Sequence, residues 1–387
     1  MAMLEAVKQE ALDFAETRPG KVVVISEHDY RTARRASVHQ IADAFTRLGH
    51  DVSFISIRFS PLSLIKGNSR NFLWDRANAP EMKDNVRCYL WKTPFHPFKS
   101  RISLIDKFAP LLYSAYGRIP SRFIDEELRS ASFVMVESGL GAILLNRARA
   151  LNEFAKIAYL ASDDLMTVGV HPYVQTRLER AGRVIDQACV TSRKMARGFR
   201  WIEDRLFFVP HGIRDDDFPK SCSNPYRSEI NAVSAGSMLF DPDFFVHAAR
   251  QFPNIMFHVI GAGRTFDAPG NVTQYPEMAF RDTMPFVMHA TLGLAPYRHA
   301  PGCEYLSDTS IKLMQYEYCG VPAICPDFAV GDSPNRFGYV PGDASSIAAA
   351  IEQALAHRRE TPRPHFLTWE DVAHRMLEPR AFADTAM

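Results

Sequence analysis

The sequence predicts an α/β protein with two doubly wound, Rossmann-like domains that face a cleft. Its 387 residues are more than one core usually serves. Short apolar runs alternate with amphipathic helical stretches, which is typical of parallel sheets whose strands are joined by helices. The alternation stops at a polar, proline-containing stretch, 219–228, and then restarts. We therefore expect a first domain that ends at residue 212 and a second domain that covers 213–366.

The first half opens with KVVVISEH (21–28), a continuous apolar run typical of a buried parallel strand. A helix is predicted over 37–48, with Gly49 as its C-terminal stop, and DVSFISI (51–57) is the next strand. Residues 58–123 show no regular pattern. Three further strands are expected at 133–138, 156–162 and 187–192.

The second half repeats the alternation of strands and helices. Its expected strands are 232–238, 254–263, 271–275, 291–297 and 321–327, and its expected helices are 244–252, 284–290, 311–320 and 346–360. Ligands of such sheets bind at the carboxyl ends of the strands, where the strand order reverses. We therefore look for functional residues in the loops that follow the strands.

Composition argues against several classes of protein. The net charge of +1 provides no field that attracts nucleic acid, so no nucleic-acid partner is expected. The six cysteines occur singly, without CxxC pairs, which favours reduced thiols. No apolar run reaches the roughly 18 residues of a transmembrane helix. Residues 1–20 carry acids early and lack the apolar core of a signal peptide, so we expect a cytoplasmic protein.

A phosphate site is predicted at the start of the helix 311–320. Residues that can cap this helix are Ser307, Asp308, Thr309 and Ser310. The free amides and the positive dipole end of a helix favour an anion. Lys312 lies in the first turn, where a cation opposes the dipole unless an anion binds in front of it; alternatively its stem covers apolar surface while the ammonium reaches water. Small residues in AGSM (235–238) would let a diphosphate approach the backbone.

Two other kinds of ligand are disfavoured. VIGAG (259–263) could begin a dinucleotide-binding GxGxxG motif, but Phe266 stands where the third glycine belongs. DPD (241–243) mimics the DxD motif of metal-dependent transferases, but it precedes a helix, so a capping role is favoured. The histidines are scattered and form no helical HxxxH pair. We therefore expect neither a cofactor nor a metal.

Six segments resemble, in the same order, those of nucleotide-sugar glycosyltransferases of the GT-B fold. They are FVPHGIRDDDF, AVSAGSM, NIMFHVIGAG, NVTQYPEM, TLGLAPY and SIKLMQYEYCGVPAI, all within residues 208–324. Each segment alone is a weak signal, and their shared order carries the resemblance. The terminal helix of that family crosses back to the first domain. LTWEDVAHRML, with Trp369 as its anchor, resembles that helix, so residues 367–387 are expected to complete the first domain.

The resemblance also implies which residues contact the nucleotide sugar. They are Ser237 and Met238 at the pyrophosphate loop, Glu277 and Met278 at the base, Tyr297, Leu306 and Ser307 near the nucleoside and sugar, and Lys312 and Gln315 at the diphosphate and ribose. Many retaining members carry a pair of Glu residues in this region. Here Glu304 is followed by Tyr305, and a lysine occupies the later position. Because the pair is absent, an inverting mechanism is implied.

An inverting transfer needs a carboxylate that accepts the proton of the acceptor hydroxyl. The strand 156–162 ends next to Asp163 and Asp164, whose carboxylates would look into the cleft. We expect Asp163 to be the general base, with Asp164 as the substitute candidate; one of the two could instead cap the following helix. Other strand-end candidates are Glu137, His28 and Asp29.

The stretch 92–123 carries six Lys or Arg residues and one Asp, interleaved with apolar side chains. This composition is typical of a protein surface that binds anionic lipid head groups, although a flexible basic loop has the same composition. Within the family, the chain most resembles the glucuronosyltransferases of xanthan-type exopolysaccharide synthesis.

That resemblance implies transfer of glucuronic acid from UDP-glucuronate to a mannose of a polyprenyl-diphosphate-linked oligosaccharide, in a β-1,2 link. The enzyme would be attached peripherally to the inner face of the cell membrane. The carboxylate of the donor sugar would need a cation, for which Lys312, Arg298 and His299 are candidates.

Other functions share parts of this pattern. Another UDP-sugar transferase would fit it equally, and a UDP-sugar epimerase of the same fold would need no lipid acceptor, so 92–123 argues against it. A two-domain binding protein without activity would need export. An NAD-dependent oxidoreductase would need the missing third glycine.

Overall fold

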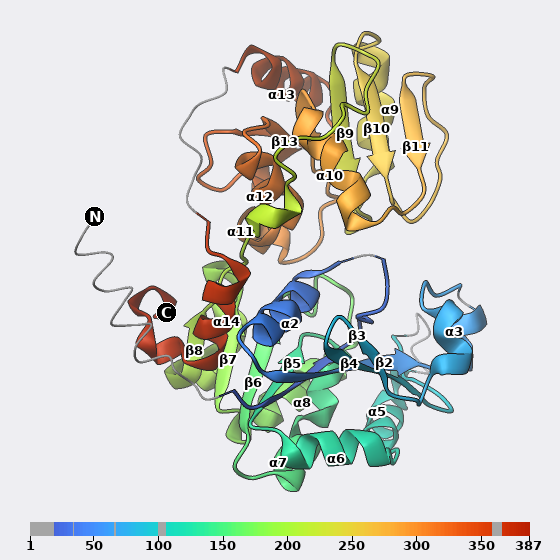
Figure 1. Ribbon diagram of the computed structural model, residues 1–387. Helices are drawn as coiled ribbons and strands as arrows, with labels where there is room; N and C mark the ends of the chain where they lie inside the picture. Colours follow the sequence, from blue (N-terminus) through green and yellow to red (C-terminus); the bar gives the residue numbers. More distant parts are fainter. Residues whose placement is uncertain (1–18, 34, 66, 100–105, 358–365) are drawn as a thin grey trace. The chain divides into compact units, whose positions relative to one another are not determined.

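A computed structural model describes residues 19–33, 35–65, 67–99, 106–357 and 366–387. The chain divides into two units. The N-terminal unit lies within Met1–His211 and Trp369–Met387, and the C-terminal unit within Gly212–Thr368. Each unit is built around a largely parallel sheet with helices packed on it (Figure 1). The α/β fold class with two Rossmann-like units is therefore confirmed.

In the described residues, the N-terminal unit contains an eight-stranded sheet in the order β3-β4-β2-β1-β5-β6-β7-β8. The strands are β1 (Lys21–Ser26), β2 (Asp51–Phe59), β3 (Glu81–Lys83), β4 (Val86–Lys92), β5 (Phe133–Glu137), β6 (Lys156–Ala161), β7 (Gln187–Val190) and β8 (Leu206–Phe208). Only β3 pairs antiparallel, with β4. Because the other strands are parallel, their carboxyl ends lie at one edge of the sheet.

Helices of this unit follow the strands. They are α2 (Ser37–Arg47), α3 (Pro61–Ile65), α5 (Ala109–Gly117), α6 (Arg122–Ser130), α7 (Leu145–Leu151), α8 (Pro172–Arg180) and α14 (Trp369–Leu377). The predicted strand–helix–strand opening is confirmed. Val22 to Ile25 are fully buried, and Gly49 adopts φ 87° just after α2, a left-handed conformation that glycine reaches without strain.

Residues 58–123 are more regular than their pattern indicated. They contain the β3–β4 hairpin, whose turn is made by Asp84 and Asn85 at φ 49° and 61°. Asp and Asn tolerate this conformation and favour tight hairpin turns. This dipeptide before VRCYLWK was the local signal for the hairpin. The strand was hard to recognise because Tyr89 and Trp91 are buried as well as Val86, Cys88 and Leu90, so no alternation of apolar and polar residues appears.

The last helix belongs to the first unit, as the resemblance implied. α14 packs against α2, and the Trp369 side chain is buried beside the ring of His211. Lys156 forms an ion pair with Glu378, with 3.1 Å between Nζ and Oε1. Long-range contacts of this kind attach the C-terminal segment to strands that occur far earlier in the chain.

The described residues of the C-terminal unit contain a six-stranded parallel sheet in the order β11-β10-β9-β12-β13-β14. Its strands are β9 (Asn231–Ala235), β10 (Met256–Ile260), β11 (Val272–Tyr275), β12 (Leu292–Leu294), β13 (Ala323–Pro326) and β14 (Arg336–Tyr339), and its helices are α9 (Pro242–Gln251), α10 (Phe280–His289), α11 (Leu306–Thr309), α12 (Ile311–Tyr318) and α13 (Ala344–Ala356). β14 was not predicted, because RFGY has neither an apolar run nor clear alternation.

Packing fixes the position of α12 on this sheet. Tyr316 is fully buried, and its hydroxyl donates to the carbonyl oxygens of Val233 at 2.9 Å and Leu294 at 3.2 Å. A Cβ at Gly293 would lie 2.4 Å from the Tyr316 ring, so only glycine leaves room there. α12 is thereby held against β9 and β12. No helix in the described part of the chain is long and apolar enough to cross a membrane.

Candidate functional site

The strand order of the C-terminal unit reverses between β9 and β12. From β9 the chain continues to β10 on one side, whereas β12 lies on the other side. At such a reversal the loops after the two strands diverge, and the space between them receives the ligand in this class of fold. The loop after β9 contains Ser237 and Met238, and the loop after β12 begins with Ala295 and contains Tyr297. The reversal therefore coincides with residues expected from the sequence.

Ser310 caps α12. Its Oγ accepts a hydrogen bond from the backbone N–H of Leu313 at 3.3 Å and lies 2.5 Å from the hydroxyl of Tyr297. Of the four possible capping residues, the structure thus selects the last. Residues 306–309 form a separate short helix, α11. Because Tyr297 is buried and reaches Ser310, the end of β12 is linked directly to the start of α12.

Lys312 lies beside the small-residue loop after β9. A Cβ at Gly236 would lie 4.0 Å from the Lys312 Nζ, and that Nζ is 5.1 Å from the centre of the Tyr297 ring. Gly236 adopts φ 100°, a left-handed conformation that suits glycine. The ammonium is therefore adjacent to the loop in which a diphosphate site was predicted. Gln315, one turn further along α12, is half-buried.

The next loops extend this edge. A Cβ at Gly263 would lie 3.3 Å from the Cβ of Ser237, and a Cβ at Gly261 would lie 3.4 Å from the Cα of Glu277. The loop after β10 therefore contacts both the loop after β9 and the loop after β11. Glu277 is exposed, and Met278, Ser237 and Met238 are half-buried. These four residues thus lie in adjoining loops at one edge of the sheet, next to the start of α12, which carries Lys312.

Leu306 and Ser307 lie deeper in the unit than the other expected contacts. Both are buried, with exposed fractions of 2% and 4%. The Ser307 Oγ donates to the Asp308 carboxylate at 2.7 Å and is 3.0 Å from the carbonyl oxygen of Glu304. The Ser307 carbonyl oxygen accepts from Arg336 at 2.5 Å. The contacts of Ser307 therefore lie within the segment before α12 and with Arg336 of β14.

Arg336 and Glu317 were missed from the sequence. They form an ion pair of 3.0 Å with little exposure, and Arg336 also donates to backbone oxygens of Ser307 and Val330. The pair joins β14 to α12 and to the loop before it. No local signal marks such a pair, because its partners come from separate elements.

In the N-terminal unit, the strand order reverses between β1 and β5. Glu137 ends β5 at this point and is 5% exposed. Its carboxyl group accepts hydrogen bonds from Ser26 at the end of β1 and from Ser162 just after β6, the latter at 3.2 Å. Burial raises the pKa of Glu137 to about 8, and the Asp163 carboxylate adds to the rise. Glu137 is therefore largely protonated at neutral pH.

Asp163 and Asp164 follow β6 and have different surroundings. The Asp164 Oδ1 accepts hydrogen bonds from the N–H groups of Met166 and Thr167, both at 2.9 Å, and lies 3.1 Å from the Thr167 hydroxyl. Asp164 therefore caps the turn after the strand. The backbone N–H of Asp163 donates to the Ser138 hydroxyl at 3.2 Å, which ties Asp163 to the end of β5.

The other strand-end candidates, Asp29 and His28, have different surroundings. The buried Asp29 carboxylate accepts two hydrogen bonds from Arg31, and these hold its pKa below the usual value despite burial. His28 lies against the ring of His39 at 5.6 Å between centroids. Glu27, which the sequence reading did not single out, pairs with Arg58 and accepts from the N–H of Leu140 at 2.7 Å.

The DPD motif behaves as a cap, as predicted. The Asp241 Oδ1 accepts from the N–H of Asp243 at 3.2 Å at the start of α9. In the described ranges, no group of three or more His, Cys, Asp or Glu residues is placed to hold a metal ion. Whether catalysis is independent of metal therefore stays a prediction.

Comparison with known proteins extends these observations. The family described as "Glucuronosyltransferase GumK, N-terminal domain" matches residues 24–191. The UDP-glucuronate:glycolipid 2-beta-glucuronosyltransferase of Xanthomonas campestris pv. campestris is 39% identical over 371 residues, which cover 94% of this chain and 91% of that protein.

Two solved structures share the fold at low identity. They are sucrose-phosphate synthase from Thermosynechococcus elongatus, with a TM-score of 0.62 and 14% identity, and Anabaena HepE in complex with UDP and glucose, with a TM-score of 0.60 and 11% identity; each alignment covers 94% of both chains. The fold of this chain is accordingly the GT-B fold of glycosyltransferases. Identity of 39% over nearly the whole chain shows that it belongs to the GumK family of glucuronosyltransferases.

Proposed function

We propose that this enzyme transfers glucuronic acid from UDP-glucuronate to a hydroxyl of a lipid-linked oligosaccharide, with inversion at the anomeric carbon. The observation that carries the proposal is the 39% identity, over 94% of the chain, to a UDP-glucuronate:glycolipid 2-beta-glucuronosyltransferase. The polyprenyl diphosphate carrier, the mannose acceptor and the β-1,2 link in exopolysaccharide synthesis are the finer form of this proposal. They follow from the family resemblance.

The donor is proposed to bind at the carboxyl edge of the C-terminal sheet. Lys312 and the amides at the start of α12 would face the diphosphate, and the loop at Gly236 would approach it closely. The Lys312 ammonium and the helix amides provide positive charge where negative charge grows on the leaving UDP. This charge stabilises the transition state more than the ground state. The remaining expected contacts are Ser237, Met238, Glu277, Met278, Tyr297, Leu306, Ser307 and Gln315.

Asp163 is proposed as the general base. An oxygen of the acceptor attacks the anomeric carbon and forms the new C–O bond, while the bond from that carbon to the diphosphate oxygen breaks and UDP leaves with the electron pair. The proton of the acceptor hydroxyl passes to the Asp163 carboxylate. Asp164 has a capping role that occupies one of its oxygens, which supports Asp163 as the choice. The neutral Glu137 adds no second negative charge beside the base.

Attachment to the inner face of the cell membrane is also proposed. Within the described part of 92–123, Phe98, Phe108, Leu111 and Leu112 are exposed, as are Lys99 and Lys107. Exposed apolar side chains next to cations fit an anionic lipid surface. Residues 100–105, which were part of the expected membrane surface, lie outside the described residues.

Transfer is tested with purified protein, labelled UDP-glucuronate and a lipid-linked oligosaccharide, with UDP-glucose as a competing donor and an arm in EDTA. We expect transfer of glucuronate, without loss in EDTA, and a β-linked product. Asp163→Asn should lower kcat by roughly 100-fold or more while UDP binding is retained. The matched control is Asp164→Asn, which keeps the capping oxygen and should retain most activity. Equal loss in both variants would remove Asp163 from its role, and transfer of glucose alone would overturn the donor.

A further inference from the structure

The N-terminal unit has a cavity at the outer part of the sheet edge that carries Asp163. This cavity of about 250 Å³ opens between three segments of the unit. It is lined by Ser60, Leu62, Pro94, Phe95, His96, Pro97, Phe98, Asp106, Ala109 and Leu112. We call it the apolar pocket. Its segments follow β2, follow β4 and lead into α5. Because β2, β4, β1, β5 and β6 run in parallel, the pocket and Asp163 share one edge of the sheet.

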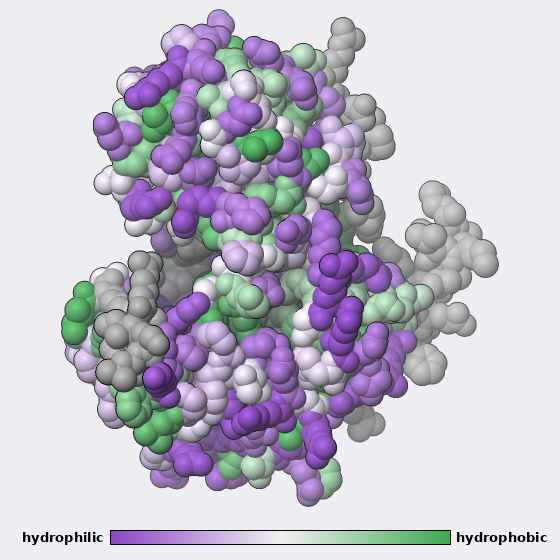
Figure 2. All heavy atoms as spheres, turned by 180° about the vertical axis from the view of Figure 1, so that it is seen from behind, coloured by the Kyte–Doolittle hydropathy of each residue, from purple (hydrophilic) through white to green (hydrophobic). Residues whose placement is uncertain are grey.

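Hydrocarbon dominates the surface in and around this pocket. Phe98 and Leu112 line it and are each 39% exposed. On the same segments, Ile65 at the end of α3 and Leu111 in α5 are 83% and 68% exposed. Figure 2 shows hydrophobic side chains gathered at the margin of this unit where α3 and α5 lie. Exposed apolar side chains that gather beside a cavity are typical of a surface that binds an apolar partner.

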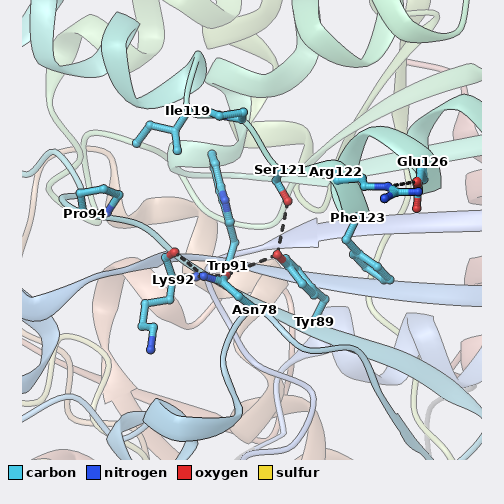
Figure 3. A pocket seen from close by; sticks show the side chains of 11 residues that line it. Asn78, Tyr89, Trp91, Lys92, Pro94, Ile119, Ser121, Arg122, Phe123 and Glu126 are labelled. Atoms are coloured by element: carbon cyan, nitrogen blue, oxygen red, sulfur yellow. Dashed lines mark hydrogen bonds and ion pairs between the residues drawn. The ribbon is translucent and has the colours of Figure 1, made fainter.

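A polar pocket adjoins the apolar pocket across Pro94, which lines both. Its volume is about 510 Å³, and the residues in Figure 3 line it: Asn78, Tyr89, Trp91, Lys92, Pro94, Ile119, Pro120, Ser121, Arg122, Phe123 and Glu126. Two cations, Lys92 and Arg122, and one carboxylate, Glu126, are among its lining residues. Arg122 pairs with Glu126 at 2.7 Å, and the Lys92 ammonium donates to the carbonyl oxygen of Trp74 at 3.1 Å. Both cations therefore already have partners within the protein.

We propose that the apolar pocket binds the first units of the hydrocarbon chain of the lipid-linked acceptor. The inference rests on the proposed function and adds a lipid subsite to it. A cavity lined mainly by apolar side chains favours hydrocarbon over charged groups, because burying a charge there without a partner is costly.

The subsite also suits the geometry of transfer. The pocket lies after β2 and β4, so it is separated from Asp163 after β6 by three to four strand spacings, roughly 14–19 Å. The head group and saccharide of the acceptor would cover this distance and bring the terminal hydroxyl to the base. The lipid would thus position the acceptor by its far end, which lowers the entropy cost of aligning the reacting groups.

Binding is tested with farnesyl diphosphate, a soluble prenyl probe, in saturating UDP so that the donor site is occupied. We expect saturable binding by calorimetry, and far weaker binding of inorganic diphosphate. Leu112→Asp should weaken binding of the probe by roughly tenfold or more, because a carboxylate replaces apolar lining. The matched control, Phe154→Asp, changes an apolar side chain that is 90% exposed and precedes β6, at the opposite edge of the sheet, and should leave probe affinity within about twofold.

Phe98→Ala changes a second residue that lines the apolar pocket and should also weaken binding of the probe. Circular dichroism spectra and the affinity for UDP verify that all variants fold. Absence of probe binding, or equal effects of Leu112→Asp and Phe154→Asp, would overturn the subsite. A transfer assay separates this result from the proposed function. If the wild type uses lipid-linked and lipid-free acceptors with the same KM, the subsite fails while the transferase activity stands. If it transfers to neither but binds the probe, the proposed function fails instead.

Discussion

The Glu137→Gln variant is expected to be more stable than the wild type in its N-terminal unit, and this difference should grow as the pH rises. The Glu137 carboxyl is buried at the end of β5, and burial together with the Asp163 carboxylate raises its pKa to about 8 from a usual value of 4.5. The folded chain therefore keeps this proton through neutral pH, whereas the unfolded chain releases it. Between pH 4.5 and 8 the folded state binds more protons, so the wild-type free energy of unfolding falls as pH rises through this window.

The interval between the two pKa values limits the effect. Each pKa unit corresponds to about 1.36 kcal/mol, so the interval from 4.5 to about 8 is worth at most about 5 kcal/mol, fully expressed above pH 8. Relaxation around the buried carboxylate reduces this value. Gln has the shape of the protonated acid and cannot ionise, so the variant lacks this loss. At pH 5, where Glu137 is largely neutral in the folded state, the difference should be small.

Tryptophan fluorescence makes the measurement selective. All four tryptophans, Trp74, Trp91, Trp201 and Trp369, belong to the N-terminal unit, so their emission during urea unfolding reports on that unit. Unfolding free energies of both proteins are compared at several pH values from 5 to 9. Glu203→Gln, at an exposed carboxylate, is the matched control and should show no pH-dependent difference. A wild-type-to-variant difference that stays constant across this range would refute the reasoning.

Three further predictions concern the C-terminal unit. Lys312→Ala should weaken UDP binding by roughly tenfold, since an ammonium beside the diphosphate is lost, and calorimetry that finds unchanged affinity would exclude the phosphate role. Ser310→Ala should cost about 1 kcal/mol of unfolding free energy, because α12 loses its cap and Tyr297 its partner, with thermal unfolding as the measurement. Gly293→Ala should cost roughly 1–3 kcal/mol, because its Cβ would lie 2.4 Å from the ring of the fully buried Tyr316; an unchanged melting temperature would contradict this packing.

Local chemistry in the sequence was sufficient for the fold class, while the donor-site residues stay predictions. Buried parallel strands are continuous apolar runs, and helices between them keep a 3.6-residue period, so both patterns appear without knowledge of contacts. Gly49 and the DPD motif acted as predicted, because capping depends on neighbours in the chain. The order of the motifs after residue 208 was enough to identify the glycosyltransferase fold.

Only the tertiary structure decided the burial and the hydrogen-bond partners of each polar residue. Asp163 and Asp164 are equivalent in the sequence, but Asp164 caps a turn while Asp163 lies beside a buried carboxyl of another strand. The high pKa of Glu137 arises from the packing of β1, β5 and β6, whose order no local period encodes. The apolar pocket likewise joins segments after β2 and β4 with the start of α5. These features depend on strand order and burial, which are properties of contacts between distant residues, whereas periodicity and capping are properties of residues within a few turns of one another.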